Sequence, residues 1–445
     1  MSSTSGPTGL YAPTKNLRRI GLVPFVALLF AYCAGGPFSL ESMISTSGPG
    51  LGLTFLLVVP LLFAVPIALA TAEMTTLMPV EGGFYRWSRA ALGDFWGFQC
   101  GWWNWTGTFL LSAAYGVAMA DYLEDWLPVH SRAEHWGVAV GFLLVVAYLN
   151  VRGIHLVGNL TLVLLLAMAI PVVVFVVMGF RQAQFNPFHP FLPTDRPWQG
   201  AFGVGLAIAL WLYAGYEQLS TVIEEVENPA RNFPIGLAVV VPLAVGVYLI
   251  TLAAGLAALG NWQEWQTGYL VTAARLVGGR VLGTSIFVAA VICNFVLLDS
   301  TLLSVTRVPL TMAEDGYLHP GLAKVSARYG TPVRAIVLSA GFCAALALFT
   351  VPQLIGVYAW TRMATSIETV VSFWQLRRKY PDAPRAFRVG GGVVGAMVIV
   401  LAPTLLFGWA MIYSDVATRK WGLLNLASGP VAYLWVWRRR RVKVH

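Results

Sequence analysis

Long apolar stretches alternate with short polar connections along almost the whole chain. A helix needs about 17–25 predominantly apolar residues to cross a bilayer, and each stretch reaches about that length. The connections between them are too short to hold a water-soluble domain. The pattern therefore predicts an all-α integral membrane protein with about 12 transmembrane helices, at residues 20–46, 51–78, 94–125, 133–150, 154–179, 200–226, 235–260, 281–312, 333–350, 353–379, 393–414 and 421–437.

Two of these predicted helices are interrupted. Gly35, Gly36 and Pro37 lie in the middle of the first stretch, and residues 214–217 lie in the middle of the sixth. Glycine has low helix propensity and proline lacks a backbone N–H, so both positions favour a break. Broken backbone at membrane depth is tolerated where its polar groups face protein, ligand or water. Two broken helices in corresponding halves of a chain indicate the binding site of a secondary transporter.

The two interrupted segments also resemble each other. Residues 36–44 and 215–223 carry glycine, leucine and isoleucine at matching positions, which favours an internal repeat. We therefore expect two five-helix repeats followed by two further helices. The predicted parts are a cytoplasmic tail at 1–19, a first repeat at 20–180, a second repeat at 200–379, helices 11 and 12 at 393–437, and a basic cytoplasmic tail at 438–445.

Composition supports the membrane prediction, and charge orients the chain. Hydrophobic residues make up 57% of the chain and charged residues only 11%, whereas soluble domains carry about 25% charged residues. The net charge is +9, and basic residues concentrate at one set of helix ends, including residues 377–379 and 438–441. By the positive-inside rule both termini lie in the cytoplasm, in a multi-pass protein of the cell (plasma or inner) membrane. Such basic clusters contact anionic lipid, so no nucleic-acid partner is expected.

Sequence motifs for catalysis are absent. The six histidines form no H-E-x-x-H motif, and the chain contains no G-x-S-x-G motif. Residues 390–395 match G-x-G-x-x-G formally, but no strand precedes them, so a dinucleotide site is excluded. The four cysteines are scattered in apolar stretches without C-x-x-C spacing, which is typical of small core residues. We predict no enzyme activity and no cofactor.

Several motifs resemble the amino acid–polyamine–organocation (APC) superfamily. The resemblance rests on residues 224–234, on Arg307 with residues 312–316, and on residues 377–388. It implies the leucine-transporter-type 5+5 inverted repeat, with broken helices 1 and 6. Within the superfamily, the polyamine-uptake branch known from plants is the most similar, on the segments 35–38, 96–99, 150–153 and 157–158.

Candidate substrate-binding residues cluster at the two breaks. Glu41 and Glu217 are acidic residues close to the interruptions, and we expect both to border one central cavity. A carboxylate there would bind an ammonium group or a coupling proton; the alternative is that it caps free helix N–H groups. The candidate substrate-binding residues are Gly35, Gly36, Phe38, Ser39, Glu41, Ala214, Gly215, Tyr216 and Glu217.

A second group of residues is a candidate for substrate binding or ion coupling. Ser300 and Thr301 could supply oxygen ligands for sodium, although such hydroxyls often bond within their own helix. Arg362 could hold a substrate carboxylate, or it could pair with an internal acid such as Glu368. Glu73 is expected to form a salt bridge at a helix end. The complete second group is Trp103, Asp299, Ser300, Thr301, Arg362 and Glu368.

The fifth predicted helix bears on the coupling ion. The resemblance implies a lysine there in proton-coupled amino acid transporters, and the corresponding position in this chain is Met168. The helix contains no Lys, Asp or Glu between residues 154 and 179. A coupling proton would therefore need a carboxylate elsewhere, so H⁺ and Na⁺ both stay open.

Together these observations predict a secondary active transporter that works by alternating access and is ion- or proton-coupled; we predict a symporter, and uniport and exchange stay open. Pro37 removes one backbone donor that could hold a carboxylate, so a cationic amine substrate, a polyamine or a cationic amino acid, is favoured. The alternative is a neutral amino acid transporter or exchanger of the same fold. A channel and a transport-inactive nutrient sensor are alternatives of a different class.

Overall fold

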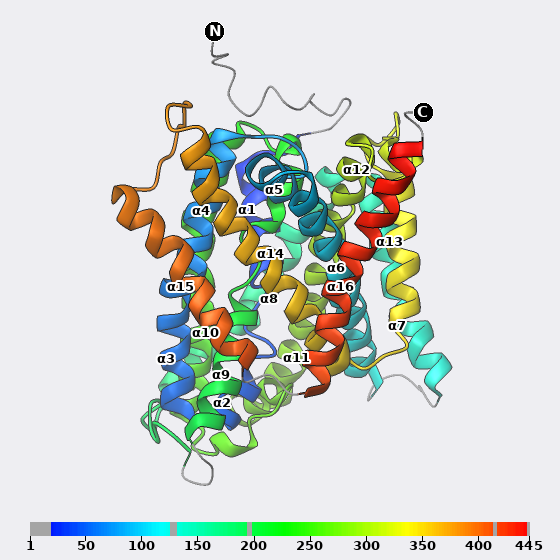
Figure 1. Ribbon diagram of the computed structural model, residues 1–445. Helices are drawn as coiled ribbons and strands as arrows, with labels where there is room; N and C mark the ends of the chain where they lie inside the picture. The colour runs from blue at the N-terminus through cyan, green and yellow to red at the C-terminus, as the bar shows by residue number, and fades with distance from the viewer. Residues whose placement is uncertain (1–18, 125–130, 194–197, 413–415, 443–445) are drawn as a thin grey trace.

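The computed structural model describes residues 19–124, 131–193, 198–412 and 416–442, and helices make up its architecture (Figure 1). The predicted apolar stretches are helical over most of their length. Among the described residues, six helical segments are long and apolar enough to cross a membrane, and three shorter helices are similarly apolar. Among the described residues, one isolated β-bridge pairs Ile20 with Val226.

The described residues of the first half of the chain form eight α-helices. One π-helical turn, η2 (Pro60–Ala64), joins α3 to α4 within a single membrane-length segment. The helices are α1 (Leu22–Cys33), α2 (Glu41–Ser47), α3 (Pro49–Val59), α4 (Val65–Leu77), α5 (Phe84–Leu92), α6 (Asp94–Glu124), α7 (Arg132–Arg152) and α8 (Ile154–Arg181).

In the second half, the part of the chain that the structure describes adds eight α-helices and short 3₁₀ segments. The 3₁₀ segments are η3 (Gln218–Glu225), η4 (Trp262–Glu264) and η5 (Pro320–Ala323). The α-helices are α9 (Trp198–Leu212), α10 (Pro229–Ala258), α11 (Tyr269–Val305), α12 (Arg307–Glu314), α13 (Val333–Leu346), α14 (Val351–Lys379), α15 (Gly392–Ile412) and α16 (Val416–Val442).

The eighth predicted stretch differs from the structure at both ends. It was expected as one helix at 281–312, but α11 begins at Tyr269, and a separate helix, α12, follows Thr306. The early start has a packing reason, since Leu270, Ala273, Ala274 and Val277 recur at helical spacing and are buried. The backbone then kinks at Gly279, within α11.

The outer surface of the bundle is apolar, and charged residues lie inside it. Large hydrophobic side chains are exposed on outer helices, among them Leu61, Val163, Ile170, Val398 and Leu405. Glu41, Asp299 and Arg307, in contrast, are fully or almost fully buried. This distribution is the inverse of a soluble protein and fits a bilayer as the surrounding solvent.

The two ends of the bundle differ. α5, α12 and the C-terminal end of α16 lie together at one end, called here the α5 end, while α2 lies at the opposite end, the α2 end (Figure 1). At the α5 end the first and sixth helices are joined by backbone: the Ile20 N–H donates to the Glu225 carbonyl at 2.8 Å, and the Glu227 N–H donates to the Ile20 carbonyl at 2.9 Å.

Buried ion pairs hold the α5 end closed. Arg307 of α12 donates to both carboxylate oxygens of Glu225, at 2.7 and 3.1 Å, with both side chains almost inaccessible to solvent. Arg377 of α14 binds both oxygens of Glu73 on α4, at 2.8 and 2.5 Å. The salt bridge predicted for Glu73 is therefore confirmed.

Candidate functional site

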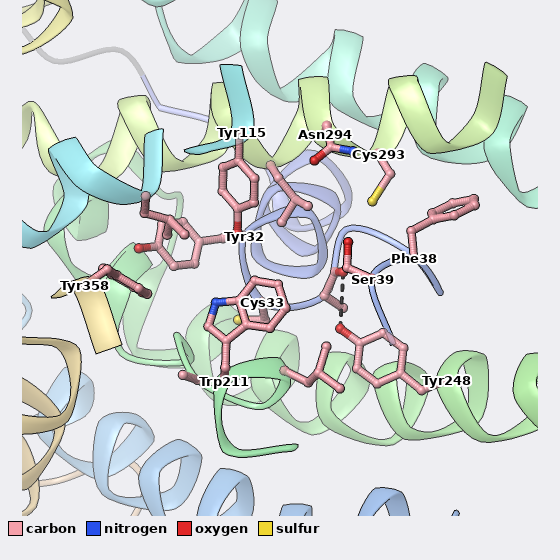
Figure 2. Close-up of a pocket in the computed structure, with 15 residues that line it drawn as sticks. Tyr32, Cys33, Phe38, Ser39, Tyr115, Trp211, Tyr248, Cys293, Asn294 and Tyr358 are labelled. Carbon is pink, nitrogen blue, oxygen red and sulfur yellow. Dashed lines mark hydrogen bonds between the residues drawn. The ribbon is translucent and has the colours of Figure 1, made fainter. Parts of the chain in front are cut away.

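The first predicted break is present. α1 ends at Cys33 and α2 begins at Glu41, so the backbone between them is not α-helical. Gly35 has φ +63°, and a Cβ there would lie 2.6 Å from the Leu297 side chain of α11. Only glycine meets both requirements, because the left-handed conformation and the close approach each disfavour a side chain. The freed Ala34 carbonyl accepts a hydrogen bond from the Tyr248 hydroxyl at 3.2 Å (Figure 2).

The second break is also present, and it contacts the first helix. α9 ends at Leu212, and the chain resumes as the 3₁₀ segment η3 from Gln218. Gly215 has φ +122°, and a Cβ there would lie 3.0 Å from the ring of Tyr32 on α1. The segment after the break is thus a tighter 3₁₀ helix rather than an α-helix. The two interruptions meet inside the bundle.

A small cavity, called here the central cavity, lies where the breaks meet (Figure 2). Its volume is about 40 Å³, which is room for water-sized groups only. Aromatic rings from α1, the first break, α6, α9, α10 and α14 line it, and none of its 15 lining residues carries a formal charge. The aromatic residues are Tyr32, Phe38, Tyr115, Trp211, Tyr248 and Tyr358, and the others are Cys33, Ala34, Ser39, Leu111, Leu212, Ala214, Cys293, Asn294 and Leu297.

Glu217 does not line the central cavity, contrary to the prediction. It is fully buried and forms an ion pair with Arg362 of α14, while the Ser366 hydroxyl donates to the same carboxylate oxygen at 2.8 Å. The interpretation that Arg362 pairs with an internal acid is therefore confirmed, but that acid is Glu217 and not Glu368. An ionised carboxylate buried beside an available guanidinium is stabilised by pairing, which explains why Glu217 turns toward α14.

Glu41 also lies outside the cavity lining, so the expectation that both carboxylates border one cavity is wrong. Its carboxylate accepts a hydrogen bond from the Leu270 N–H at 3.4 Å, at the start of α11, and its other oxygen has no partner. It interacts electrostatically with Cys293, which does line the cavity. Glu41 therefore lies behind the cavity wall, where its carboxylate interacts with the first turn of α11 and with the backbone at the start of its own helix.

The remaining candidates at the two breaks divide into two sets. Phe38, Ser39 and Ala214 line the central cavity. Gly36 packs against Met168 of α8, since a Cβ at Gly36 would lie 3.0 Å from the methionine sulfur. Tyr216 is buried, its hydroxyl has no partner, and it does not line the cavity.

The second group of candidates is dispersed. The Trp103 indole donates to the Leu426 carbonyl of α16 at 2.8 Å, away from the cavity lining. Asp299 accepts a hydrogen bond from the Asn150 amide at 2.7 Å, which ties α11 to α7. Glu368 accepts a hydrogen bond from the Ser88 hydroxyl of α5.

The proposed sodium ligands differ in their partners. The Ser300 hydroxyl donates to the Val296 carbonyl at 2.8 Å, within its own helix, whereas the buried Thr301 hydroxyl has no partner. Among the described residues, no group of three or more His, Cys, Asp or Glu side chains is arranged to hold a metal ion. Ser300 is thus engaged by the helix bonding that was the alternative to a sodium role.

Sequence reasoning missed most of the aromatic lining. Tyr32, Tyr115 and Tyr248 lie on three helices far apart in the chain, and only their packing brings them together. Tryptophans and tyrosines are common in membrane helices, so nothing in their local sequence marks them. Phe38, beside a break, was the one cavity aromatic whose position carried a signal.

An all-helical membrane bundle in which two interrupted helices meet at a small cavity has the architecture of a membrane transporter. The model of the amino acid permease family matches residues 20–436, and the chain belongs to this family. Its function class is accordingly transport and not catalysis.

Named relatives share most of the chain. Polyamine transporter RMV1 of Arabidopsis thaliana is 31% identical over 430 residues, covering 96% of this chain and 86% of the relative. Polyamine transporter PUT1 of Oryza sativa subsp. japonica is 30% identical over 427 residues, covering 94% and 78%. Uncharacterized transporter Rv1999c of Mycobacterium tuberculosis is 28% identical over 337 residues, covering 75% and 74%.

Proposed function

We propose that this protein is a secondary transporter that moves polyamines across the membrane by alternating access. The observation that carries the proposal is the central cavity, where six aromatic residues surround uncharged polar groups at the meeting point of the two breaks. Aromatic faces attract cations by about 0.5–2 kcal/mol each, most strongly away from water. The two plant relatives are named polyamine transporters, which supports the same substrate class.

The surroundings of the cavity favour an amine over a carboxylate. None of the described residues that line it is Lys, Arg or His, and Arg362 is engaged by Glu217 on the other side of the cavity wall. Pro37 lacks the N–H that could hold a carboxylate at the first break. Glu41 has an oxygen without a partner, and we propose it as the carboxylate that attracts an ammonium group.

We further propose the finer architecture: 12 transmembrane helices, a leucine-transporter-type 5+5 inverted repeat, and two C-terminal helices. The apolar helices and the two breaks support it. The α5 end, rich in arginine, is proposed to face the cytoplasm of a plasma or inner membrane. A cavity of about 40 Å³ is too small for a diamine, so the walls must separate to admit substrate, which fits alternating access.

The substrate test is uptake into proteoliposomes. Labelled putrescine is supplied, and unlabelled spermidine, arginine and alanine compete, with and without a sodium or pH gradient. Saturable uptake with counterflow, blocked by spermidine and not by alanine, supports the proposal. The gradient that stimulates uptake, of pH or of sodium, identifies H⁺ or Na⁺ as the coupling ion.

Other outcomes favour the alternatives. Competition by alanine alone favours the neutral amino acid transporter or exchanger, a function that the family's name supports. Flux without saturation or counterflow favours a channel. Substrate binding without uptake favours a nutrient sensor.

A further inference from the structure

A second cavity, called here the side pocket, lies between α9, α14 and α15. Its volume is about 380 Å³, within the range of about 300–1,000 Å³ that is typical of small-molecule sites. Its walls are almost wholly apolar and include Phe63, Trp360, Phe407 and Met411. An apolar tail would therefore be stabilised there by removal from water or by close packing.

Among the described residues that line the side pocket, Arg362 is the only charged one. Only 4% of its side chain is exposed. One guanidinium nitrogen binds Glu217, while Nε and Nη1 have no hydrogen-bond partner. Buried donors without partners are costly, and an anionic acceptor would satisfy them.

The side pocket adjoins the proposed substrate site. Trp211, Ala214 and Tyr358 line both the side pocket and the central cavity. Trp211 belongs to α9, the helix that ends at the second break. A molecule in the side pocket would therefore contact the wall of the central cavity and the ion pair that anchors the break.

We propose that the side pocket binds an amphiphile with a singly charged anionic head, with its tail against α9 and α15 and its head at Arg362. The apolar walls select the tail, and the two unpartnered guanidinium nitrogens select the negative charge over a neutral or cationic head. The head can come from a free carboxylic acid or from an anionic lipid. Because the bound molecule packs between α9 and α14, it restrains the broken sixth helix and slows transport.

The test combines binding with transport. The purified full chain is placed in phosphatidylcholine proteoliposomes and labelled with a ten-carbon carboxylate that carries a photoreactive diazirine in its tail. Peptide mapping should locate the label on α9, α14 or α15. Decanoate should compete about 10- to 100-fold better than 1-decanol or decyltrimethylammonium, because only decanoate can satisfy the charged donors.

Two matched variants locate the site. Ala410→Trp fills the pocket from α15, where Ala410 is buried, whereas Leu405→Trp changes an exposed position on the same helix. Ala410→Trp should remove labelling and make putrescine uptake insensitive to decanoate, and Leu405→Trp should change neither. The thermal unfolding temperature of each variant checks that it is folded. A third variant, Arg362→Lys, should retain more labelling than Arg362→Gln.

Labelling in vesicles of different lipid composition identifies whether the anionic head belongs to a lipid or to a free carboxylic acid. If vesicles that contain phosphatidylglycerol suppress labelling, the natural ligand is an anionic lipid; if they do not, it is a free carboxylate. Equal competition by decanol and decanoate, or unchanged labelling in folded Ala410→Trp protein, would overturn the proposal. The labelling result does not depend on which substrate is transported, so it stands apart from the outcome for polyamine uptake.

Discussion

Glu217, in the break of the sixth helix, is bound by Arg362 of α14, and Ser366 of the same helix donates to the same oxygen at 2.8 Å. Both members of the ion pair are buried. The pair fixes the break against α14 and neutralises a carboxylate beside the central cavity. Glu217 thus anchors the wall of the cavity in this conformation.

The ion pair predicts an asymmetric mutational response. Glu217→Gln leaves the Arg362 charge buried without a counter-charge, so it should destabilise the protein by about 3–5 kcal/mol and reduce putrescine uptake. The double variant Glu217→Gln, Arg362→Gln removes both charges and should recover most of the stability but not the uptake. Thermal unfolding and initial uptake rates measure the two effects.

The comparison of single and double variants also tests the pairing itself. Additive losses of stability in the double variant would contradict a coupled pair. Wild-type uptake in the folded double variant would contradict a role of this pair in transport.

The aromatic lining predicts a graded effect on substrate affinity. Tyr115 of α6 lines the central cavity. Tyr115→Phe keeps an aromatic face and should change the KM for putrescine little. Tyr115→Leu removes the face and should raise the KM by about 2- to 30-fold, as expected for one cation–π contact. Equal KM values for the two variants in saturation uptake would contradict cation recognition by this ring.

Local sequence predicted the breaks well, because glycine and proline act on the backbone where they stand. Gly35 and Gly215 both adopt positive φ angles at the predicted interruptions. The partners of the charged residues were not predictable in the same way. Arg362 pairs with Glu217 and not with Glu368 because the fold brings the second break beside α14, and only the folded arrangement sets that distance.

The same limit applies to the cavity. Three of its tyrosines lie on α1, α6 and α10, which have little amphipathic character. Because lipid surrounds these helices, their outer faces are as apolar as their inner faces, and polar residues do not distinguish the two. The positions of the helices could be predicted from the lengths of the apolar stretches. Which face of each helix points into the bundle could not be predicted from the sequence. The start of α11 was also missed, because its first turns are partly polar yet packed.

The glycine at the second break gives a prediction about backbone strain. Gly215→Ala places a Cβ at φ +122° and 3.0 Å from the Tyr32 ring. It should destabilise the protein by about 1–3 kcal/mol and slow uptake. Gly246→Ala is the matched control, because Gly246 lies inside α10 with no atom within 4 Å of the added Cβ, and alanine favours helix. Equal unfolding temperatures for the two variants would contradict the strain.

The closed α5 end contains a cluster of three acidic residues around one arginine. Glu81 and Glu224 exchange hydrogen bonds: the Glu81 N–H donates to the Glu224 carboxylate at 3.0 Å, and the Glu224 N–H donates to the Glu81 carboxylate at 3.2 Å. Arg307 is engaged by Glu225. The other oxygen of Glu81 is buried without a partner. Burial, with the nearby Glu225 and Glu224, raises the pKa of Glu81 well above its ordinary value.

This cluster predicts that pH controls opening at the α5 end. A carboxyl group whose pKa is raised by closure takes up a proton when the end closes, so its contribution favours closure at low pH and is lost as pH rises through the raised pKa. The amides of Glu81 and Phe84, which donate to Glu224 and Ser220, should exchange with deuterium faster at high pH, after correction for the intrinsic pH dependence of exchange. Glu81→Gln should flatten this profile, because the amide still accepts the Glu224 hydrogen bond but does not ionise. A corrected profile in Glu81→Gln that matches the wild type would show that another group controls the opening.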